Sequence, residues 1–110
     1  MTKVYLWYKD TRFGYLTMQG EKYLWTPDVA TLESLDPVYK FALLLPFKKT
    51  VFDEMPPRFT DFAYTKRADL LEKAKILPAD TPFERLVKFA SLPFTRLDYY
   101  ISLSDVYSPR

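Results

Sequence analysis

The chain contains neither cysteine nor histidine. Without cysteine it can form no disulfide, thiolate nucleophile or cysteine metal site, and this composition is typical of intracellular proteins. The absence of histidine removes the commonest general base near neutral pH and the commonest metal ligand. We therefore expect a cytoplasmic protein that uses no metal or other cofactor and is not an enzyme.

Glycine is also scarce, since Gly14 and Gly20 are the only two in the sequence. Two isolated glycines cannot form the glycine-rich loops that cradle nucleotide phosphates. No apolar run approaches the ~20 residues that span a membrane, and the N-terminus does not have the pattern of a secretion signal. The formal net charge of +2 is too small to indicate a polyanionic partner.

Apolar and aromatic residues are abundant. The 110 residues are 48% hydrophobic and 18% aromatic, which is rich enough for one domain with its own core and too rich for disorder. We expect a single domain over residues 1–103, followed by a tail over residues 104–110.

The first half of the chain has the patterns of β-strands. Residues 4–8 and 12–16 are rich in β-branched and aromatic side chains, and a third strand is expected over residues 22–26 after a turn at Gly20. Gly14 indicates a β-bulge or the close approach of another backbone. Residues 28–37 read as a loop with one helical turn, and the apolar residues 38–45 as a fourth, buried strand.

The second half changes to helical spacing. One apolar stripe begins at Phe52, although a regular helix can start only at about Pro56 and Pro57. A second stripe ends before Pro78, and a third helix starts at Thr81 with a capping box to Glu84. Residues 98–103 read as a closing strand. The predicted fold class is α+β, with a small antiparallel β-meander sheet covered by two or three helices. The stripes are Phe52, Met55, Phe59, Phe62 and Ala63; Leu70, Leu71, Ala74 and Leu77; and Phe83, Leu86, Val87 and Ala90.

Several short motifs occur in an order that resembles the N-terminal subdomain of HipA-type toxin kinases. They are Gly14-Tyr15-Leu16, Tyr23-Leu24-Trp25, Leu45-Pro46-Phe47 and Pro82-Phe83-Glu84-Arg85-Leu86. In that family the subdomain precedes a much larger catalytic body, which this chain lacks. A separate chain of this kind resembles the HipS family, the small component of tripartite HipBST toxin-antitoxin systems.

The resemblance implies an antitoxin without catalytic activity. Its partner would be a HipT-like serine/threonine kinase toxin, which it would hold inactive, in a complex that can include a HipB-like DNA-binding protein. Members of the wider family act on aminoacyl-tRNA synthetases, so protein synthesis is the process that would be protected. The same features also fit a fragment or structural subunit of a HipA-like kinase.

The partner-binding residues are expected among aromatic and cationic side chains, since Tyr, Trp and Arg usually anchor interfaces. The candidates are Phe59, Phe62, Tyr64, Lys66 and Arg67 at a helix junction, and Phe47, Lys48 and Lys49 in a loop. One departure from the family bears on the first group. After Phe59 the family has a Leu-Leu-Pro-acidic segment, whereas this chain continues Thr60-Asp61-Phe62-Ala63.

For the aromatic residues on the expected strands we predict a structural role instead of a partner contact. Trp7, Tyr23 and Trp25 are expected to pack in the core or on the sheet, as are Tyr99 and Tyr100.

Two other classes of function remain open at this point. In a single-stranded RNA-binding module the aromatic side chains Tyr5, Trp7, Tyr15 and Trp25 would stack on bases, with Lys3, Lys9, Arg12 and Lys22 on phosphates. The near balance of 16 basic and 14 acidic residues opposes direct nucleic-acid binding. An enzyme would have to rely on carboxylates such as Asp53, Glu54 and Asp61, for which charges near a helix start are the simpler explanation.

Overall fold

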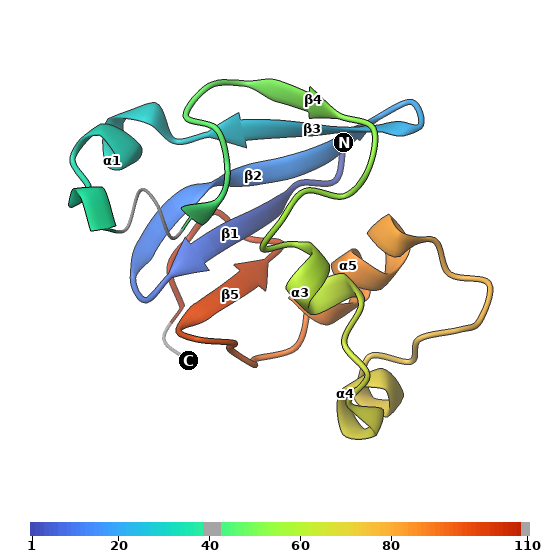
Figure 1. Cartoon of the computed structure of the whole chain (residues 1–110). Helices are drawn as coiled ribbons and strands as arrows, with labels where there is room; N and C mark the ends of the chain where they lie inside the picture. The colour runs from blue at the N-terminus through green and yellow to red at the C-terminus, as the bar shows by residue number, and fades with distance from the viewer. Residues whose placement is uncertain (39–42, 109–110) are drawn as a thin grey trace.

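The computed structural model describes residues 1–38 and 43–108 and contains one antiparallel sheet of five strands (Figure 1). β1 (Val4–Tyr8), β2 (Thr11–Gln19) and β3 (Lys22–Pro27) form the expected meander. β4 (Thr50–Phe52) pairs with β3 at one edge, and β5 (Tyr99–Ser102) pairs with β1 at the other, which gives the order β4-β3-β2-β1-β5. The α+β fold class and the closing strand are confirmed.

Gly14 has both of the roles that its position in the second strand predicts. The register between β1 and β2 shifts after Leu6, which pairs with Gly14, while Trp7 pairs with Arg12. On its other side Gly14 faces Pro27 of β3, and a Cβ atom at Gly14 would lie 2.5 Å from the carbonyl oxygen of Thr26. Its φ of 150° is also one that side-chain-bearing residues rarely adopt.

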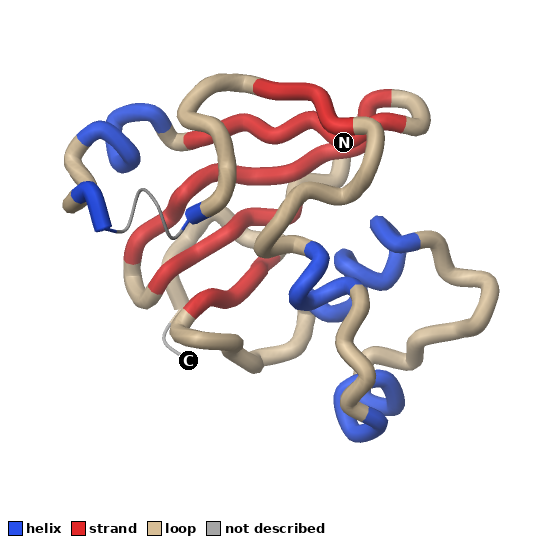
Figure 2. The backbone as a smooth tube through the Cα atoms, viewed as in Figure 1, coloured by secondary structure: helices blue, strands red, loops and turns tan. Residues whose placement is uncertain are grey.

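Four described helices accompany the sheet (Figure 2). They are α1 (Val29–Glu33), α3 (Thr60–Ala63), α4 (Ala68–Lys73) and α5 (Pro82–Ala90). α5 packs on β1 and β5, α3 packs on α5, and α4 lies farther from the sheet. The capping box of Thr81 and Glu84 is confirmed, and α5 buries Leu86, Phe89 and Ala90.

α3 is shorter than the apolar stripe suggested. Phe52, the first residue of that stripe, belongs to β4, and the helix starts only at Thr60. Pro56 and Pro57 have no backbone amide hydrogen to donate, and Arg58 has a positive φ of 73°, so the chain cannot be helical through this segment.

The expected strand over residues 38–45 is only partly open to comparison, because residues 39–42 lie outside the described part of the chain. Val38 and Leu43 have helical backbone, and Leu44 has a positive φ of 60°. The described ends of this run are therefore not a strand, and β4 takes the place beside β3 instead. Its apolar character has another cause: Leu43 and Leu45 are buried in the core.

The two faces of the sheet are covered differently. The helical face carries the main core, which includes Val4, Leu6, Phe13, Leu16 and Trp25. The opposite face carries a second cluster of Tyr5, Trp7 and Tyr100, with Tyr15 packed against it. Trp7, Tyr23, Trp25, Tyr99 and Tyr100 are all buried, as their strand positions predicted.

The segment after β5, expected as a tail, lies against this second cluster. The Tyr107 ring lies 6.1 Å from the Trp7 ring, and Arg12 donates a hydrogen bond of 3.3 Å to the carbonyl oxygen of Asp105. Trp7 Nε1 donates to Ser102 Oγ at 2.8 Å, and Ser102 Oγ donates to the carbonyl oxygen of Ser104. The tail thus partly covers the sheet face that no helix covers.

Candidate partner-binding surface

Two of the predicted contact residues belong to the core. Phe59 is fully buried and its ring packs edge-on against Trp25 at 5.7 Å, while Phe62 is 1% exposed and packs against Phe94. Phe59 directly precedes α3 and Phe62 lies within it, and both side chains belong to the main core. The prediction that Phe59 and Phe62 contact a partner is therefore wrong for the folded chain.

The remaining residues of that group lie on the surface, in the link between α3 and α4. Tyr64 ends α3 and is 52% exposed, and Lys66 and Arg67 are exposed as well. The backbone of the link is held at two points: the Tyr64 amide donates to the Thr60 carbonyl oxygen at 3.1 Å, and Arg67 at the start of α4 donates from its amide to Thr65 Oγ1 at 3.4 Å. A large aromatic side chain and two cations thus project from an anchored segment.

Tyr64 borders three shallow depressions of the surface. One, which we call the Arg96 hollow, is lined by Thr60, Asp61, Tyr64, Thr65, Lys66, Arg67 and Arg96. A second lies toward Leu71, Pro82 and Arg85. The third lies toward Tyr23 and Asp53 at the β3–β4 edge. Partial burial raises the pKa of Tyr23, and the nearby Tyr64 hydroxyl raises it further.

Arg67 and Asp69 form a bidentate ion pair beside the Arg96 hollow. Arg67 Nη2 lies 2.8 Å from Asp69 Oδ2 and Arg67 Nε lies 3.3 Å from Asp69 Oδ1. Hydrogen bonding from this guanidinium is the main cause that lowers the pKa of the Asp69 carboxyl. Within residues 1–38 and 43–108, by contrast, Lys66 and Arg96 are in no ion pair.

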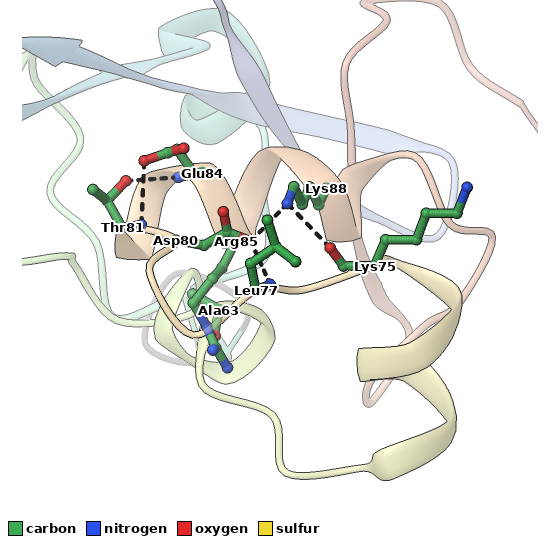
Figure 3. A network of polar contacts seen from close by, with 8 residues as sticks. All are labelled: Ala63, Lys75, Leu77, Asp80, Thr81, Glu84, Arg85 and Lys88. Atoms are coloured by element: carbon green, nitrogen blue, oxygen red, sulfur yellow. Dashed lines mark hydrogen bonds and ion pairs between the residues drawn. The ribbon is translucent and has the colours of Figure 1, made fainter.

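A polar network behind the link joins α5 to α3 and to the α4–α5 connection (Figure 3). Arg85 Nε donates to the Ala63 carbonyl oxygen at 2.8 Å. Asp80 Oδ2 accepts from the Leu77 amide at 2.8 Å and from Lys88 Nζ at 2.6 Å, and the same ammonium donates to the Lys75 carbonyl oxygen. The Arg85 bond thus holds the backbone directly before Tyr64, and the Asp80 and Lys88 bonds hold the α4–α5 connection against α5.

The second predicted group, Phe47, Lys48 and Lys49, also lies on the surface, and Phe47 is 42% exposed. The loop leads into β4 and is tied to β3 by Trp25 Nε1, which donates to the Pro46 carbonyl oxygen at 2.9 Å. In Figure 1 it runs past the sheet on the α1 side, away from α4. The structure does not bring the two predicted groups into one surface.

Arg96 was not anticipated as a site residue. It lies far from Lys66 in the sequence, just before β5, and reaches the hollow because the chain returns past α3 to complete the sheet. No local motif surrounds it, so only the tertiary fold reveals the juxtaposition.

The geometry bears on the two other classes of function. Trp25, one of the four aromatics that an RNA-binding sheet would use, is fully buried under the helices, while Tyr5 and Trp7 are 9% and 4% exposed. Of the three carboxylates considered for catalysis, Asp53 and Glu54 line the depression at the β3–β4 edge, whereas Asp61 lines the Arg96 hollow. Asp53 pairs with Lys22 at 3.2 Å and Asp61 with Arg58 at 3.6 Å.

Over residues 1–38 and 43–108 no group of three or more acidic side chains is placed to hold a metal ion, and no helix there has the length and apolar character to cross a membrane. Neither the scan against protein-family models nor the search of curated proteins finds a match to this chain.

Proposed function

We propose that this protein is a cytoplasmic, non-catalytic antitoxin that binds a HipT-like serine/threonine kinase and holds it inactive. The chain takes the place of the N-terminal subdomain that the shortened kinase lacks. A HipB-like DNA-binding protein can join the two in a ternary complex. The order of motifs in the sequence supports this proposal, and the α+β fold agrees with it.

The observation that carries the binding role is the surface around Tyr64. An aromatic side chain that is 52% exposed stands beside Lys66 and Arg67 and borders three depressions. Exposed aromatic and cationic residues on a supported backbone are the usual anchors of protein interfaces. A partner that fills these depressions would bury Tyr64 without rearranging the core.

The first test is co-purification with the products of neighbouring genes, followed by a growth assay. The kinase alone should arrest growth, and its co-expression with this chain should restore growth at a stoichiometric ratio. If the kinase binds the chain and stays toxic, the chain is not an antitoxin, and its function is that of a structural subunit of a HipA-like kinase. A kinase that neither binds nor is inhibited would refute the antitoxin proposal.

The second test asks whether the Tyr64 surface makes the contact. Tyr64→Ala removes an exposed ring and should weaken capture of the kinase at least about tenfold, since aromatic anchors contribute roughly 2 kcal/mol or more. Tyr107→Ala is the matched control, because Tyr107 is 46% exposed and lies on the opposite face of the sheet. Equal losses in the two variants would argue against the Tyr64 surface.

A further inference from the structure

The Arg96 hollow is rich in groups that bind anions. Its lining includes the cations Lys66, Arg67 and Arg96 and the hydroxyl-bearing residues Thr60, Tyr64 and Thr65. Ammonium, guanidinium and hydroxyl groups are all hydrogen-bond donors to carboxylate or phosphoryl oxygens. The composition therefore favours an anionic group over an apolar one.

The charge of the hollow remains positive after its internal ion pairs are counted. Asp61 is paired with Arg58 and Asp69 with Arg67, which leaves Lys66 and Arg96 uncompensated among the described residues. The hollow thus presents two positive charges that the described residues do not neutralise.

Arg96 is held on an unusual turn. Residues 96–99 form a two-residue turn in which Arg96 and Tyr99 exchange backbone hydrogen bonds of 2.8 and 2.9 Å. Both central residues have positive φ, 52° for Leu97 and 67° for Asp98, where glycine or asparagine is usual. The Lys9 amide fixes the turn by donating to the Asp98 carbonyl oxygen at 3.0 Å. A strained but anchored backbone of this kind is common where a side chain must be presented in one place.

We propose that the Arg96 hollow binds an acidic segment of the protein partner, with an anionic side chain between Lys66 and Arg96. This inference rests on the proposed function and specifies which chemical group of the partner the chain recognises. A protein segment fits better than a nucleic acid, because the hollow offers only two unpaired cations and the chain as a whole has nearly balanced charge, with 16 basic and 14 acidic residues. The group that binds is an oxyanion, which is either the carboxylate of Glu or Asp or the phosphate of a phosphorylated serine.

Peptide titrations of the isotope-labelled full chain test the proposal. The probes are three short peptides that differ at one central position, which is glutamate, phosphoserine or serine. The glutamate peptide, the phosphoserine peptide or both should shift the backbone amide signals of Thr65, Lys66, Arg67 and Arg96, and the stronger of the two identifies the anion. The serine peptide should not. No shifts with either anionic peptide, or shifts confined to other residues, would overturn the proposal.

Paired charge variants give the second measurement. K66A/R96A should weaken binding of the anionic peptide at least about tenfold, because it removes both uncompensated cations. K3A/K73A is the matched control, since it removes two exposed positive charges away from the hollow, and it should bind as the wild type does. Equal affinities of the two variants would refute the site, as would tighter binding of a single-stranded oligonucleotide than of either peptide at the same charge.

The same variants separate this inference from the proposed function. If K66A/R96A loses the anionic peptide and the wild type still fails to bind any kinase, the anion site stands and the antitoxin proposal fails. If K66A/R96A captures the kinase and restores growth as well as the wild type does, the antitoxin proposal stands and the hollow is not its contact. Circular dichroism of both variants confirms that they are folded.

Discussion

At the scale of single residues, the fold depends most on Gly14. Its backbone has a φ of 150°, and a Cβ atom there would lie within 2.8 Å of three atoms of residues 25–27. These neighbours are backbone and a buried indole ring, so relief of the clash would require displacement of the backbone or of that ring. The position therefore combines a conformational and a steric requirement for glycine.

Gly14→Ala should lower the free energy of unfolding by more than about 3 kcal/mol, because the sheet must separate or the Trp25 ring must leave its position. Gly20→Ala provides the control. Gly20 also has a positive φ, of 64°, but a Cβ atom there would meet nothing within 4 Å, so the cost should be about 1 kcal/mol. Urea denaturation measures both, and equal costs would contradict the steric argument.

In the turn before β5, by contrast, a mutation should raise the free energy of unfolding. Asn and Gly adopt a positive φ at a lower energetic cost than Leu and Asp. Replacing Leu97 by Asn and Asp98 by Gly in this exposed turn should therefore stabilise the chain by about 1 kcal/mol. Thermal denaturation measures the gain. The control is Leu97→Ala, which shortens the exposed side chain and keeps the backbone conformation, so it should not stabilise. An Asn-Gly variant with an unchanged or lower midpoint would show that the turn is not strained.

At the scale of elements, α5 is the best defined helix. Its capping box satisfies two backbone amides, those of Thr81 and Glu84, at 3.2 Å each. Thr81→Ala should cost about 1 kcal/mol of stability in urea denaturation. Ser91→Ala at the other end of the helix is the control and should change stability by less than about 0.5 kcal/mol. Equal effects would mean that the cap does not stabilise α5.

The stability that Asp80 gives to the connection between α4 and α5 depends on pH. Hydrogen bonds from the Leu77 amide and the Lys88 ammonium lower the pKa of the Asp80 carboxyl. The charged form is thus favoured in the folded state. Its stabilising effect is fully present above the pKa of the unfolded chain, about 3.9, and is lost as the pH falls through the lower folded value.

Asp80→Asn should therefore destabilise the chain at neutral pH, and the difference from the wild type should shrink as the pH falls below about 4. Urea midpoints measured across this range test the sign. Asp53→Asn is the control, because the pair of Asp53 with Lys22 is exposed and should contribute little at any pH. A difference for Asp80→Asn that stays constant with pH would contradict the assignment.

The elements also show how far the sequence alone can go. The meander, the bulge at Gly14, the capped helix and the closing strand follow from local patterns of alternation, glycine and capping residues, and they were predicted correctly. At the described ends of residues 38–45 the strand prediction is wrong, because a buried apolar segment has the same sequence pattern in a strand as in other core packing. Leu43 and Leu45 are buried, but the backbone around Leu44 is not extended.

The candidate site was predictable only in part. Tyr64, Lys66 and Arg67 were placed on the surface correctly, since charged residues after a short helix rarely enter a core. The prediction groups Phe59 and Phe62 with them, because a sequence does not show which side chains at the start of so short a helix face inward. Arg96 could not be found at all, because its proximity to Lys66 is created by tertiary structure.

At the scale of the whole molecule, the uneven cover of the sheet has a measurable effect. One face is shielded by helices, whereas Tyr5, Trp7 and Tyr100 are shielded in part by residues that follow β5. Ending the chain after Ser104 should lower its thermal midpoint and increase the fluorescence of a hydrophobic dye. Tyr107→Ala alone should give a smaller change of the same sign. Unchanged dye binding in the shortened chain would show that this segment does not protect the sheet.

The pairing of β1 with β5 has a kinetic consequence. Trp7 and Ser102 are 95 positions apart in the sequence, yet they are hydrogen-bonded neighbours. During translation one edge of β1 stays open until β5 has left the ribosome. Newly made chains therefore pass through an interval in which proteases and aggregation compete with folding, and its length is set by the time needed to synthesise the segment between β1 and β5.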